Sequence, residues 1–420
     1  MDYINLDYKP KKSELIAEYL VKPAPHVTID FAVSQIAAES SIGTWTTIQT
    51  MKPRIAKELS PHVFSIKRKT NNRFLIRIAY PIALFEKGNA PQLLSALAGN
   101  IFGMKILKEL RLEQFIFPKE YLKGFKGPLY GIQGVRAITK VKERPLLGTI
   151  VKPKVGLDPI EHAQVAGEAW AGGLDIVKDD ENLTSMSFND FKRRVKKTFE
   201  KRDMIENLTN EKKIYLPNVT AETFEMLRRV EYVKSLGGEY VMIDVLTAGF
   251  GALQTLRDNS NGLAIHAHRA MHAALTRNPG HGISMLALAQ LLRLIGVDQL
   301  HIGTAIGKMQ GPKKEVKTIF NEIELPAYVS NEMVQDWGNI KPVMAVCSGG
   351  LHPLLMPQLL KIFGKDAIFQ FGGGCHGHPN GTRAGARALR QALDAALNNI
   401  PLKKAAEERP ELRQAFEKWG

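Results

Sequence analysis

Eight short apolar runs, each followed by a stretch with helical periodicity, alternate between residues 128 and 400 of this 420-residue chain. The runs are predicted strands at residues 146–151, 175–179, 214–219, 240–245, 263–268, 299–302, 344–347 and 368–371. Helical periodicity between them is clearest at residues 160–170, 221–233, 285–294, 356–363 and 385–397. Successive parallel strands need a crossover helix, so the alternation predicts a (β/α)8 TIM barrel over residues 128–400. A doubly wound open sheet is the other architecture that it permits.

Residues 1–127 have a different pattern, in the order strand, helix, strand, strand, helix, strand. Predicted strands at 15–21, 63–69, 73–80 and 105–111 enclose helices near 31–37 and 92–102. Asn71 and Asn72 suit the turn between the middle strands, because asparagine tolerates positive φ. This order predicts an N-terminal ferredoxin-like α+β domain. The charged segment 401–420 is predicted to form a C-terminal surface helix.

Composition excludes several classes of protein. No run of 18 apolar residues occurs, and the first residues lack the basic start and apolar core of a signal peptide, which predicts a cytoplasmic protein without membrane association. Cys347 and Cys375 are the only cysteines, too few for a disulfide scaffold or a cysteine metal cage.

The net charge of +15 suits either nucleic acid or small polyanions as ligands. Nucleic acid would require aromatic residues interleaved with a basic stripe, and none is found. The densest basic run, residues 192–197, is predicted to be a solvated helix face, with Phe188, Phe191, Val195 and Phe199 directed toward the core.

Reactive residues gather where the predicted barrel strands end, and that is where a barrel places its active site. The strand ends carry Lys152 and Lys154, then 178–181 (KDDE), 266–269 (HAHR), 301–304 (HIGT), 348–350 (SGG) and 372–374 (GGG). Each cluster alone is typical of a salt bridge or a turn. Their joint placement favours a catalytic site.

Lys178, Asp180 and Glu181 admit two interpretations. Strand periodicity puts Lys178 and Asp180 on one face, and Glu181 can turn back at the strand end, so two carboxylates could hold Mg²⁺. An ammonium beside a divalent cation is repulsive. Either Lys178 neutralises Asp180 and no metal binds, or its amine is converted into an anionic oxygen donor.

The glycines at 348–350 and 372–374 are predicted phosphate cradles, because a ligand can approach their backbone N–H groups closely. Arg269 and His301 offer a second anion site across the mouth, so the pocket suits a substrate with a phosphate at each end. Lys308 lies in a glycine-flanked loop that is predicted to close over the substrate as a lid.

These segments together resemble the large subunit of ribulose-1,5-bisphosphate carboxylase/oxygenase (RuBisCO), most closely its archaeal type, form III. The resemblance is collinear over residues 13–400 and rests on 173–181 (GLDIVKDDE), 152–154 (KPK), 268–272 (HRAMH), 301–304 (HIGT) with Gly307 and Lys308, 348–350 (SGG), 371–374 (FGGG), 39–45 (ESSIGTW) and 99–100 (GN).

The resemblance implies that Lys178 reacts with an activator CO₂ to become a carbamate, which binds Mg²⁺ together with Asp180 and Glu181. The carbamate would take the C3 proton of ribulose 1,5-bisphosphate, and CO₂ or O₂ would add to the resulting enediolate, CO₂ giving 3-phosphoglycerate. Lys152 would supply a proton to the cleaved product, and Lys154 would tune Lys152.

The resemblance also implies roles for the remaining site residues. His268 and His301 would contact the sugar and assist hydration, and Lys308 would orient the attacked CO₂ while paired with Glu39. One phosphate would be held by Arg269, His301 and Ser348, and the other by Thr44, Trp45, Gly349, Gly350, Gly372, Gly373 and Lys308. Asn100 would lie near the metal.

Glu39, Thr44, Trp45 and Asn100 come from the neighbouring subunit in this family. The resemblance therefore implies a homodimer with shared active sites, which could form a ring of dimers, and no small subunit. Two positions depart from many plant-type members, which have threonine at Ile150 and an acid at Gln310. These departures put turnover and discrimination between CO₂ and O₂ in question.

The alternative within the fold is a RuBisCO-like enolase or isomerase that acts on a phosphorylated sugar without fixing CO₂. Such proteins replace several of the residues named above, whereas Lys308, Glu39, Trp45, Asn100, Arg269 and Ser348 are all present here. The sequence therefore favours carboxylation.

Overall fold

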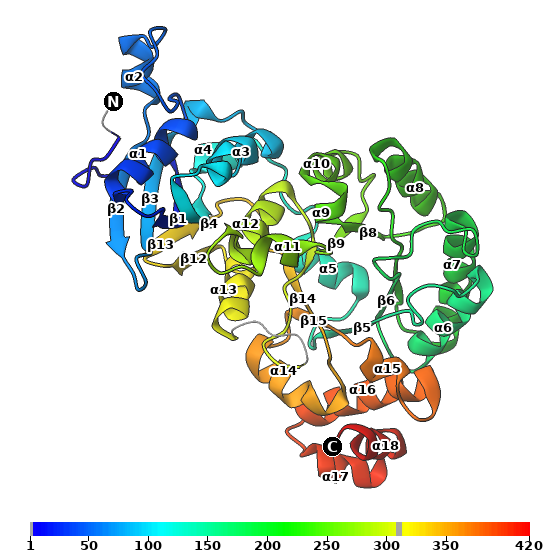
Figure 1. Cartoon of the computed structure of the whole chain (residues 1–420). Coiled ribbons are helices and arrows are strands. Elements are labelled where there is room, and N and C mark those ends of the chain that lie inside the picture. The colour runs from blue at the N-terminus through cyan, green and yellow to red at the C-terminus, as the bar shows by residue number, and fades with distance from the viewer. Residues whose placement is uncertain (1–2, 308–312) are drawn as a thin grey trace. The chain divides into compact units, whose positions relative to one another are not determined.

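The computed structural model describes residues 3–307 and 313–420 and divides them into two compact units (Figure 1). Unit 1 is built from Met1–Gly127, Met271–Ile295 and Leu325–Ile340. Unit 2 is built from Pro128–Ala270, Gly296–Glu324 and Lys341–Gly420. Two later segments of the chain thus join the N-terminal unit.

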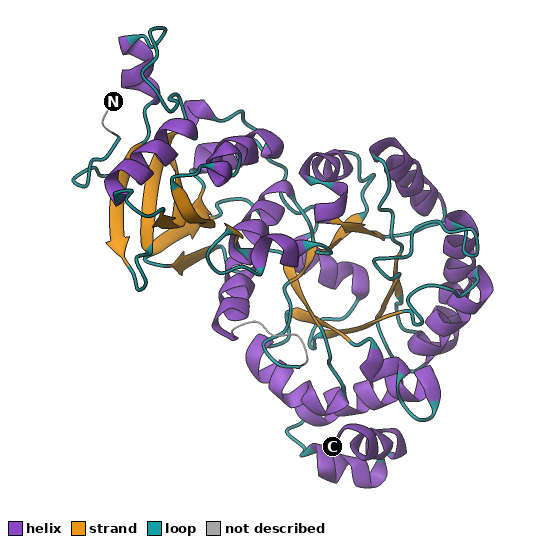
Figure 2. Ribbon diagram, in the orientation of Figure 1, coloured by secondary structure: helices purple, strands orange, loops and turns teal. Residues whose placement is uncertain are grey.

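Unit 1 contains a five-stranded sheet in the order β10-β4-β1-β3-β2 (Figure 2). Its strands are β1 (Glu14–Pro23), β2 (His62–Arg68), β3 (Phe74–Pro81), β4 (Leu107–Ile116) and β10 (Gly282–Ile283). Its N-terminal helices are α1 (Ile29–Glu39), α2 (Pro53–Leu59), α3 (Ala90–Leu97) and α4 (Lys119–Leu122). The first four strands are antiparallel neighbours in the order β4-β1-β3-β2, so the ferredoxin-like prediction is confirmed.

Two predicted elements of unit 1 have different limits. The helix predicted at 92–102 is interrupted, since α3 ends at Leu97 and a short 3-10 helix follows at Asn100–Gly103. Gly99 lies at the break, where glycine's low helix propensity favours an end. The predicted last strand continues to Ile116, because β4 pairs with β1 along nearly its whole length.

The later segments of unit 1 contribute α11 (His272–Thr276), α12 (Met285–Ile295) and a hairpin of β12 (Ala327–Ser330) and β13 (Met333–Asp336). The sequence pattern placed residues 285–294 in the barrel and predicted no strands at residues 327–336. A buried polar network explains part of the difference: Glu18, fully buried, accepts from Arg77 (2.8 Å), Gln114 (3.0 Å) and Asn331 in the hairpin turn (2.9 Å).

Unit 2 contains an eight-stranded sheet in the order β7-β6-β5-β15-β14-β11-β9-β8, all pairs parallel. The strands are β5 (Leu146–Ile150), β6 (Ile176–Lys178), β7 (Ile214–Leu216), β8 (Tyr240–Asp244), β9 (Ala264–His268), β11 (Gln299–His301), β14 (Met344–Ser348) and β15 (Ala367–Gln370). A parallel bridge between Asn218 and Met242 joins the two end strands. The sheet is therefore closed, and the barrel prediction is confirmed over the open sheet.

Helices surround this ring of strands (Figure 2). They are α6 (Pro159–Ala171), α7 (Phe191–Thr209), α8 (Thr223–Ser235), α9 (Val245–Ala248), α10 (Phe250–Asp258), α13 (Lys313–Glu324), α14 (Met356–Phe363), α15 (Gly373–His376) and α16 (Gly381–Leu397). The start of α6 shows how the sequence defines a boundary: Asp158 accepts from the backbone N–H groups of Ile160 and Glu161, and Glu161 completes a capping box.

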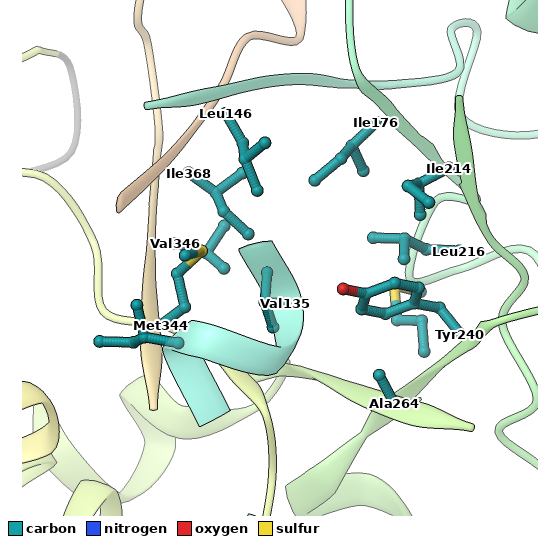
Figure 3. Close-up of a cluster of buried hydrophobic side chains, with 12 residues drawn as sticks. Val135, Leu146, Ile176, Ile214, Leu216, Tyr240, Ala264, Met344, Val346 and Ile368 are labelled. Atoms are coloured by element: carbon teal, nitrogen blue, oxygen red, sulfur yellow. The ribbon is translucent and has the colours of Figure 1, made fainter. Parts of the chain in front are cut away.

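A helix that the sequence patterns did not predict, α5 (Gly131–Thr139), contributes to the core of the barrel. Figure 3 shows Val135 from α5 among the side chains of the strands. The cluster of buried side chains comprises Ile132, Val135, Leu146, Ile176, Ile214, Leu216, Tyr240, Met242, Ala264, Met344, Val346 and Ile368. Full burial of one such aliphatic side chain stabilises the fold by about 1.5–3 kcal/mol. This apolar core fills one part of the barrel interior and leaves the strand ends for polar chemistry.

The C-terminal segment forms two helices, α17 (Leu402–Glu408) and α18 (Pro410–Trp419), where one was expected. Pro410 separates them, because proline is accepted in the first turn of a helix but not in its interior. Within residues 3–307 and 313–420, each helix is too short or too polar to cross a bilayer.

Candidate active site

The carboxyl ends of six barrel strands surround a cavity of about 180 Å³. It is lined by Ile150 and Lys152 at β5, Lys178 and Glu181 at β6, His268 of β9, His301 of β11, Ser348, Gly349 and Gly350 at β14, and Gln370, Gly372 and Gly373 at β15. Residues from distant parts of the sequence therefore meet in one place, because all the strands are parallel and end at the same rim.

Lys178, the last residue of β6, is fully buried beside two acidic groups. Its ammonium nitrogen lies 2.8 Å from the carbonyl oxygen of Asp179, 3.4 Å from Glu181 Oε2 and 3.5 Å from the sulfur of Met242. Burial lowers the pKa of Lys178, and the nearby carboxylates of Glu181 and Asp180 only partly oppose this effect. The amine is thereby more easily deprotonated, and hence more nucleophilic, than an exposed lysine.

The two carboxylates differ in their surroundings. Asp180 is fully buried and accepts from Lys152 Nζ at 2.6 Å through Oδ2, and from Asn182 through Oδ1. Glu181 is partly exposed; burial would raise its pKa, but Lys178 and His268 hold the pKa at about 2. Glu181 is therefore anionic at neutral pH.

Asp179 directly precedes Asp180 in sequence but faces the opposite side of the strand. It accepts from Tyr215 Oη (2.6 Å), from the backbone N–H of Asn218 (2.9 Å) and from Arg194 (3.1 and 3.2 Å). Burial opposes ionisation of Asp179, yet the charge of Arg194 and the hydrogen bonds hold its pKa below the usual value. Asp179 is an anchor for the end of β6 and does not line the cavity.

Arg194, the partner of Asp179, differs from what was predicted for the basic run at residues 192–197. Arg194 is fully buried, although the run was predicted to be a solvated helix face. The ion pair with Asp179 provides the reason, since a buried guanidinium requires a charge partner. Phe188, predicted to face the core, is instead 41% exposed and precedes the start of α7.

Two histidines at neighbouring strand ends are held by polar partners. His268 Nδ1 lies 3.0 Å from Asp244 Oδ1, and its Nε2 lies 3.6 Å from Glu181. His301 Nδ1 lies 2.9 Å from the Ser348 hydroxyl, and its Nε2 lies 2.9 Å from His266 Nε2. Burial, together with His268, His266 and Lys178, lowers the pKa of His301 far below its usual value, so its imidazole is neutral.

The glycine loops have conformations that other residues would strain. Gly349 and Gly350 both have positive φ, 122° and 68°. Gly307, at the base of the predicted lid loop, has φ 104°, and a Cβ atom there would lie 2.7 Å from the carbonyl oxygen of Gly349. Close backbone approach between these loops therefore requires glycine.

The other predicted residues that the structure describes do not line this cavity. Lys154 is exposed after β5, and Arg269 lies after β9, where burial lowers its pKa to about 10 and its guanidinium lies close to Gly303. Glu39, Thr44, Trp45 and Asn100 all belong to unit 1; Glu39 ends α1, and Trp45 is 81% exposed. Lys308 and Gln310 lie outside the described residues.

Two polar side chains of the site, Gln370 and Asp244, were not singled out from the sequence, and His266 was placed at a strand end without a role. Gln370 is buried, lines the cavity, and has no hydrogen-bond partner for either amide atom among the described residues. His266 and Asp244 hold His301 and His268. A signal was available, since each is a polar residue within an otherwise apolar strand.

Comparison with known proteins finds relatives that match nearly the whole chain. Residues 131–419 match the catalytic domain of the ribulose bisphosphate carboxylase large chain, and residues 2–121 match its N-terminal domain. The ribulose bisphosphate carboxylases of Methanocaldococcus jannaschii and Pyrococcus furiosus are 54% and 52% identical to the chain; the alignments cover all of this chain and 100% and 97% of those proteins.

Solved structures of archaeal RuBisCO are similar in fold. The octameric enzyme of Pyrococcus horikoshii, in complex with sulfate, has 50% identity and a TM-score of 0.93, covering 99% of this chain and 96% of that one. The dimeric enzyme of Hyperthermus butylicus has 45% identity and a TM-score of 0.95, covering 100% and 98%.

Proposed function

This chain belongs to the ribulose bisphosphate carboxylase large-chain family and has its carboxylase activity, and we propose that Lys178, Asp180 and Glu181 form its activated centre. The observation that carries the proposal is the buried amine of Lys178 beside the carboxyl groups of Asp180 and Glu181 at the mouth of the barrel. The carboxylase names of relatives about half identical over the full length favour this reading over the enolase alternative.

The chemistry of Lys178 suits carbamate formation. The ammonium first loses one proton; the neutral amine then attacks CO₂, a nitrogen–carbon bond forms, and a second proton leaves, so the cationic side chain becomes an anionic carbamate. The lowered pKa of Lys178 makes the neutral amine available. The carbamate then resolves the repulsion between lysine and metal, because it adds a third anionic oxygen donor to Asp180 and Glu181.

The donor set fits Mg²⁺, which prefers oxygen ligands. Asp180 already has a cationic group, Lys152 Nζ, 2.6 Å from its Oδ2, so this oxygen is oriented toward positive charge. The carbamate of Lys178, Asp180 and Glu181 would hold the ion. When bound, Mg²⁺ would supply Lewis acidity toward the substrate oxygens.

The other groups would hold the substrate and move its protons. The carbamate oxygen of Lys178 would take the C3 proton of ribulose 1,5-bisphosphate, and Lys152 would return a proton to the cleaved product, with Lys154 tuning it. His268 and His301 would contact the sugar. Arg269 and Ser348 would bind one phosphate, and backbone N–H groups of Gly349, Gly350, Gly372 and Gly373 the other.

The family resemblance supports a complete site only in a homodimer. Glu39, Thr44, Trp45 and Asn100 would then act in the barrel of a second copy, and Lys308 would pair with Glu39 there. Both CO₂ and O₂ would be co-substrates. The solved archaeal relatives, one dimeric and one octameric, are consistent with a dimer or a ring of dimers. The resemblance implies no small subunit.

The test is fixation of ¹⁴CO₂ with ribulose bisphosphate, after preincubation with CO₂ and Mg²⁺. We expect preincubation to be required, and Lys178→Ala and Lys178→Arg to abolish fixation while their circular dichroism stays that of the wild type. Lys178→Arg is the sharper variant, because it keeps the positive charge but cannot form this carbamate. Full activity of either variant would overturn the assignment.

A further inference from the structure

His376, the last residue of α15, connects the end of β5 to the glycine loop after β15. Its Nε2 lies 2.9 Å from the carbonyl oxygen of Ile150 and 2.9 Å from the hydroxyl of Thr149. Its Nδ1 lies 3.0 Å from the hydroxyl of Thr382, in the first turn of α16. The imidazole is therefore bonded on both nitrogens to separate segments of the barrel.

The direction of each hydrogen bond follows from the backbone carbonyl oxygens in the network, which can only accept. The carbonyl oxygen of Ile150 can only accept, so Nε2 of His376 carries the proton and donates. The hydroxyl of Thr149 lies 2.6 Å from the carbonyl oxygen of Phe371, which also only accepts, so this hydroxyl donates there. Thr382 must then donate to the unprotonated Nδ1. Burial lowers the pKa of His376 to about 4, which is consistent with a neutral ring.

This network ends on both sides at groups of the proposed active site. Ile150 is two residues before Lys152, and Phe371 is directly before Gly372. The side chain of Lys152 also runs along Gly372: a Cβ atom added at Gly372 would lie 3.6 Å from Lys152 Cε. The position of Lys152 relative to the glycine loop thus depends on the hydrogen bonds that connect β5 and β15 beyond the last paired residues of the two strands.

We propose that His376 is a positioning residue, whose hydrogen bonds to β5 and α16 hold Lys152 at the correct place over the glycine loop that binds phosphate. The proposal rests on the role of Lys152 given above, as the proton donor to the cleaved product. His376 itself touches neither substrate nor Lys152.

The chemistry of the product provides a specific readout. Cleavage leaves a carbanion at C2 of the nascent 3-phosphoglycerate, and a proton from Lys152 completes the product. If the proton arrives late, the carbanion electron pair forms a double bond to C3, and the C3–O bond breaks. Inorganic phosphate leaves, and the remaining enol becomes pyruvate. Misplacement of Lys152 therefore raises the amount of pyruvate formed per 3-phosphoglycerate, whereas loss of folded enzyme does not change this ratio.

The experiment compares three variants under saturating CO₂ and Mg²⁺. We expect His376→Leu to lower kcat and to raise the pyruvate ratio and the KM for ribulose bisphosphate, each by roughly tenfold, which is less than the roughly 10²-fold loss that a misplacement of about 1 Å can cause. His376→Gln, which retains a donor toward Ile150, should fall near the wild type. His378→Gln is the matched control, because His378 bonds the carbonyl oxygen of Glu411 in α18 instead of β5.

Several outcomes would overturn the proposal. A His376→Leu enzyme with the pyruvate ratio of the wild type, whatever its kcat, would make His376 merely structural. The same holds if His378→Gln raises the ratio equally. If His376→Leu does not fold, Thr382→Val, which removes only the hydrogen bond to Nδ1, must raise the ratio.

A further variant separates this proposal from the proposed function. Lys152→Met should be inactive or should make a larger share of pyruvate in single turnovers. If Lys152→Met keeps both turnover and ratio, the role of Lys152 is wrong. If it behaves as expected while His376→Leu matches the wild type, only the inference about His376 fails.

Discussion

Asp179 and Asp180 are adjacent acids that should respond oppositely to loss of their charge. Asp179 is fully buried against Arg194, also fully buried, and receives further hydrogen bonds from Tyr215 and Asn218. Asp179→Asn keeps the shape but removes the charge, so the guanidinium of Arg194 is left buried without its counter-ion. Breaking a buried ion pair in this way costs about 3–5 kcal/mol of unfolding free energy.

The neighbouring substitution is the control. Asp180→Asn removes the partner of Lys152, whose side chain is 28% exposed and can turn toward water. We expect it to cost about 1 kcal/mol, less than Asp179→Asn, because Asp180 is buried but the ammonium of Lys152 can be hydrated after the change. It should nevertheless abolish carboxylation, because Asp180 is a proposed metal ligand.

The assay is the apparent unfolding midpoint at one fixed scan rate, with carboxylation measured in parallel. For a domain of this size, about 2–4 °C is lost per kcal/mol, so Asp179→Asn should lower the midpoint by roughly 10 °C and Asp180→Asn by less than about 4 °C. A midpoint for Asp179→Asn within about 2 °C of the wild type would refute the anchoring argument. An equal loss in both variants would do the same.

Three more expectations can be checked directly. Burial lowers the pKa of His266 to about 3 and that of His376 to about 4, from 6.5. Above pH 6.5 both histidines are neutral in the folded and in the unfolded chain. Between pH 6.5 and about pH 4 the unfolded chain binds protons that the folded chain does not, so the unfolding free energy should fall by about 1.4 kcal/mol per pH unit for each histidine as the pH is lowered. His376→Leu should show a shallower fall, and an unchanged slope contradicts this. Mixing inactive Glu39→Gln with inactive Lys178→Ala should restore some activity if sites are shared between subunits; no recovery despite demonstrated exchange argues for sites within one chain. Lys308→Ala should retain more C3 proton exchange than ¹⁴CO₂ incorporation, and equal losses would dismiss its proposed role toward CO₂.

Local periodicity was sufficient for the architecture. The alternation of apolar runs and helical segments predicted the barrel, and the order of elements before residue 128 predicted the ferredoxin-like sheet. The period of two along a strand also placed Lys178 and Asp180 on one face, with Asp179 on the other. These features depend on neighbours in sequence, so the sequence contains them directly.

The partners of individual side chains were decided by tertiary structure alone. The basic run in α7 has the pattern of a solvated face, yet Arg194 is buried because it forms an ion pair with Asp179, which directly follows β6. Likewise, no local pattern joins the hairpin at Asn331 to Glu18, or His376 to Ile150. Such contacts link residues far apart in the chain.

The same reasoning applies to the chemistry of the site. The sequence supplied the reactive side chains at the strand ends, and left open whether Lys178 is a simple salt-bridge partner or an altered ligand. Burial in the folded barrel lowers the pKa of that amine, and burial is a property of the packed chain. Residue type and order thus determined which groups meet at the barrel mouth, and packing determined their charge, since the cost of ionisation depends on the water that the fold excludes.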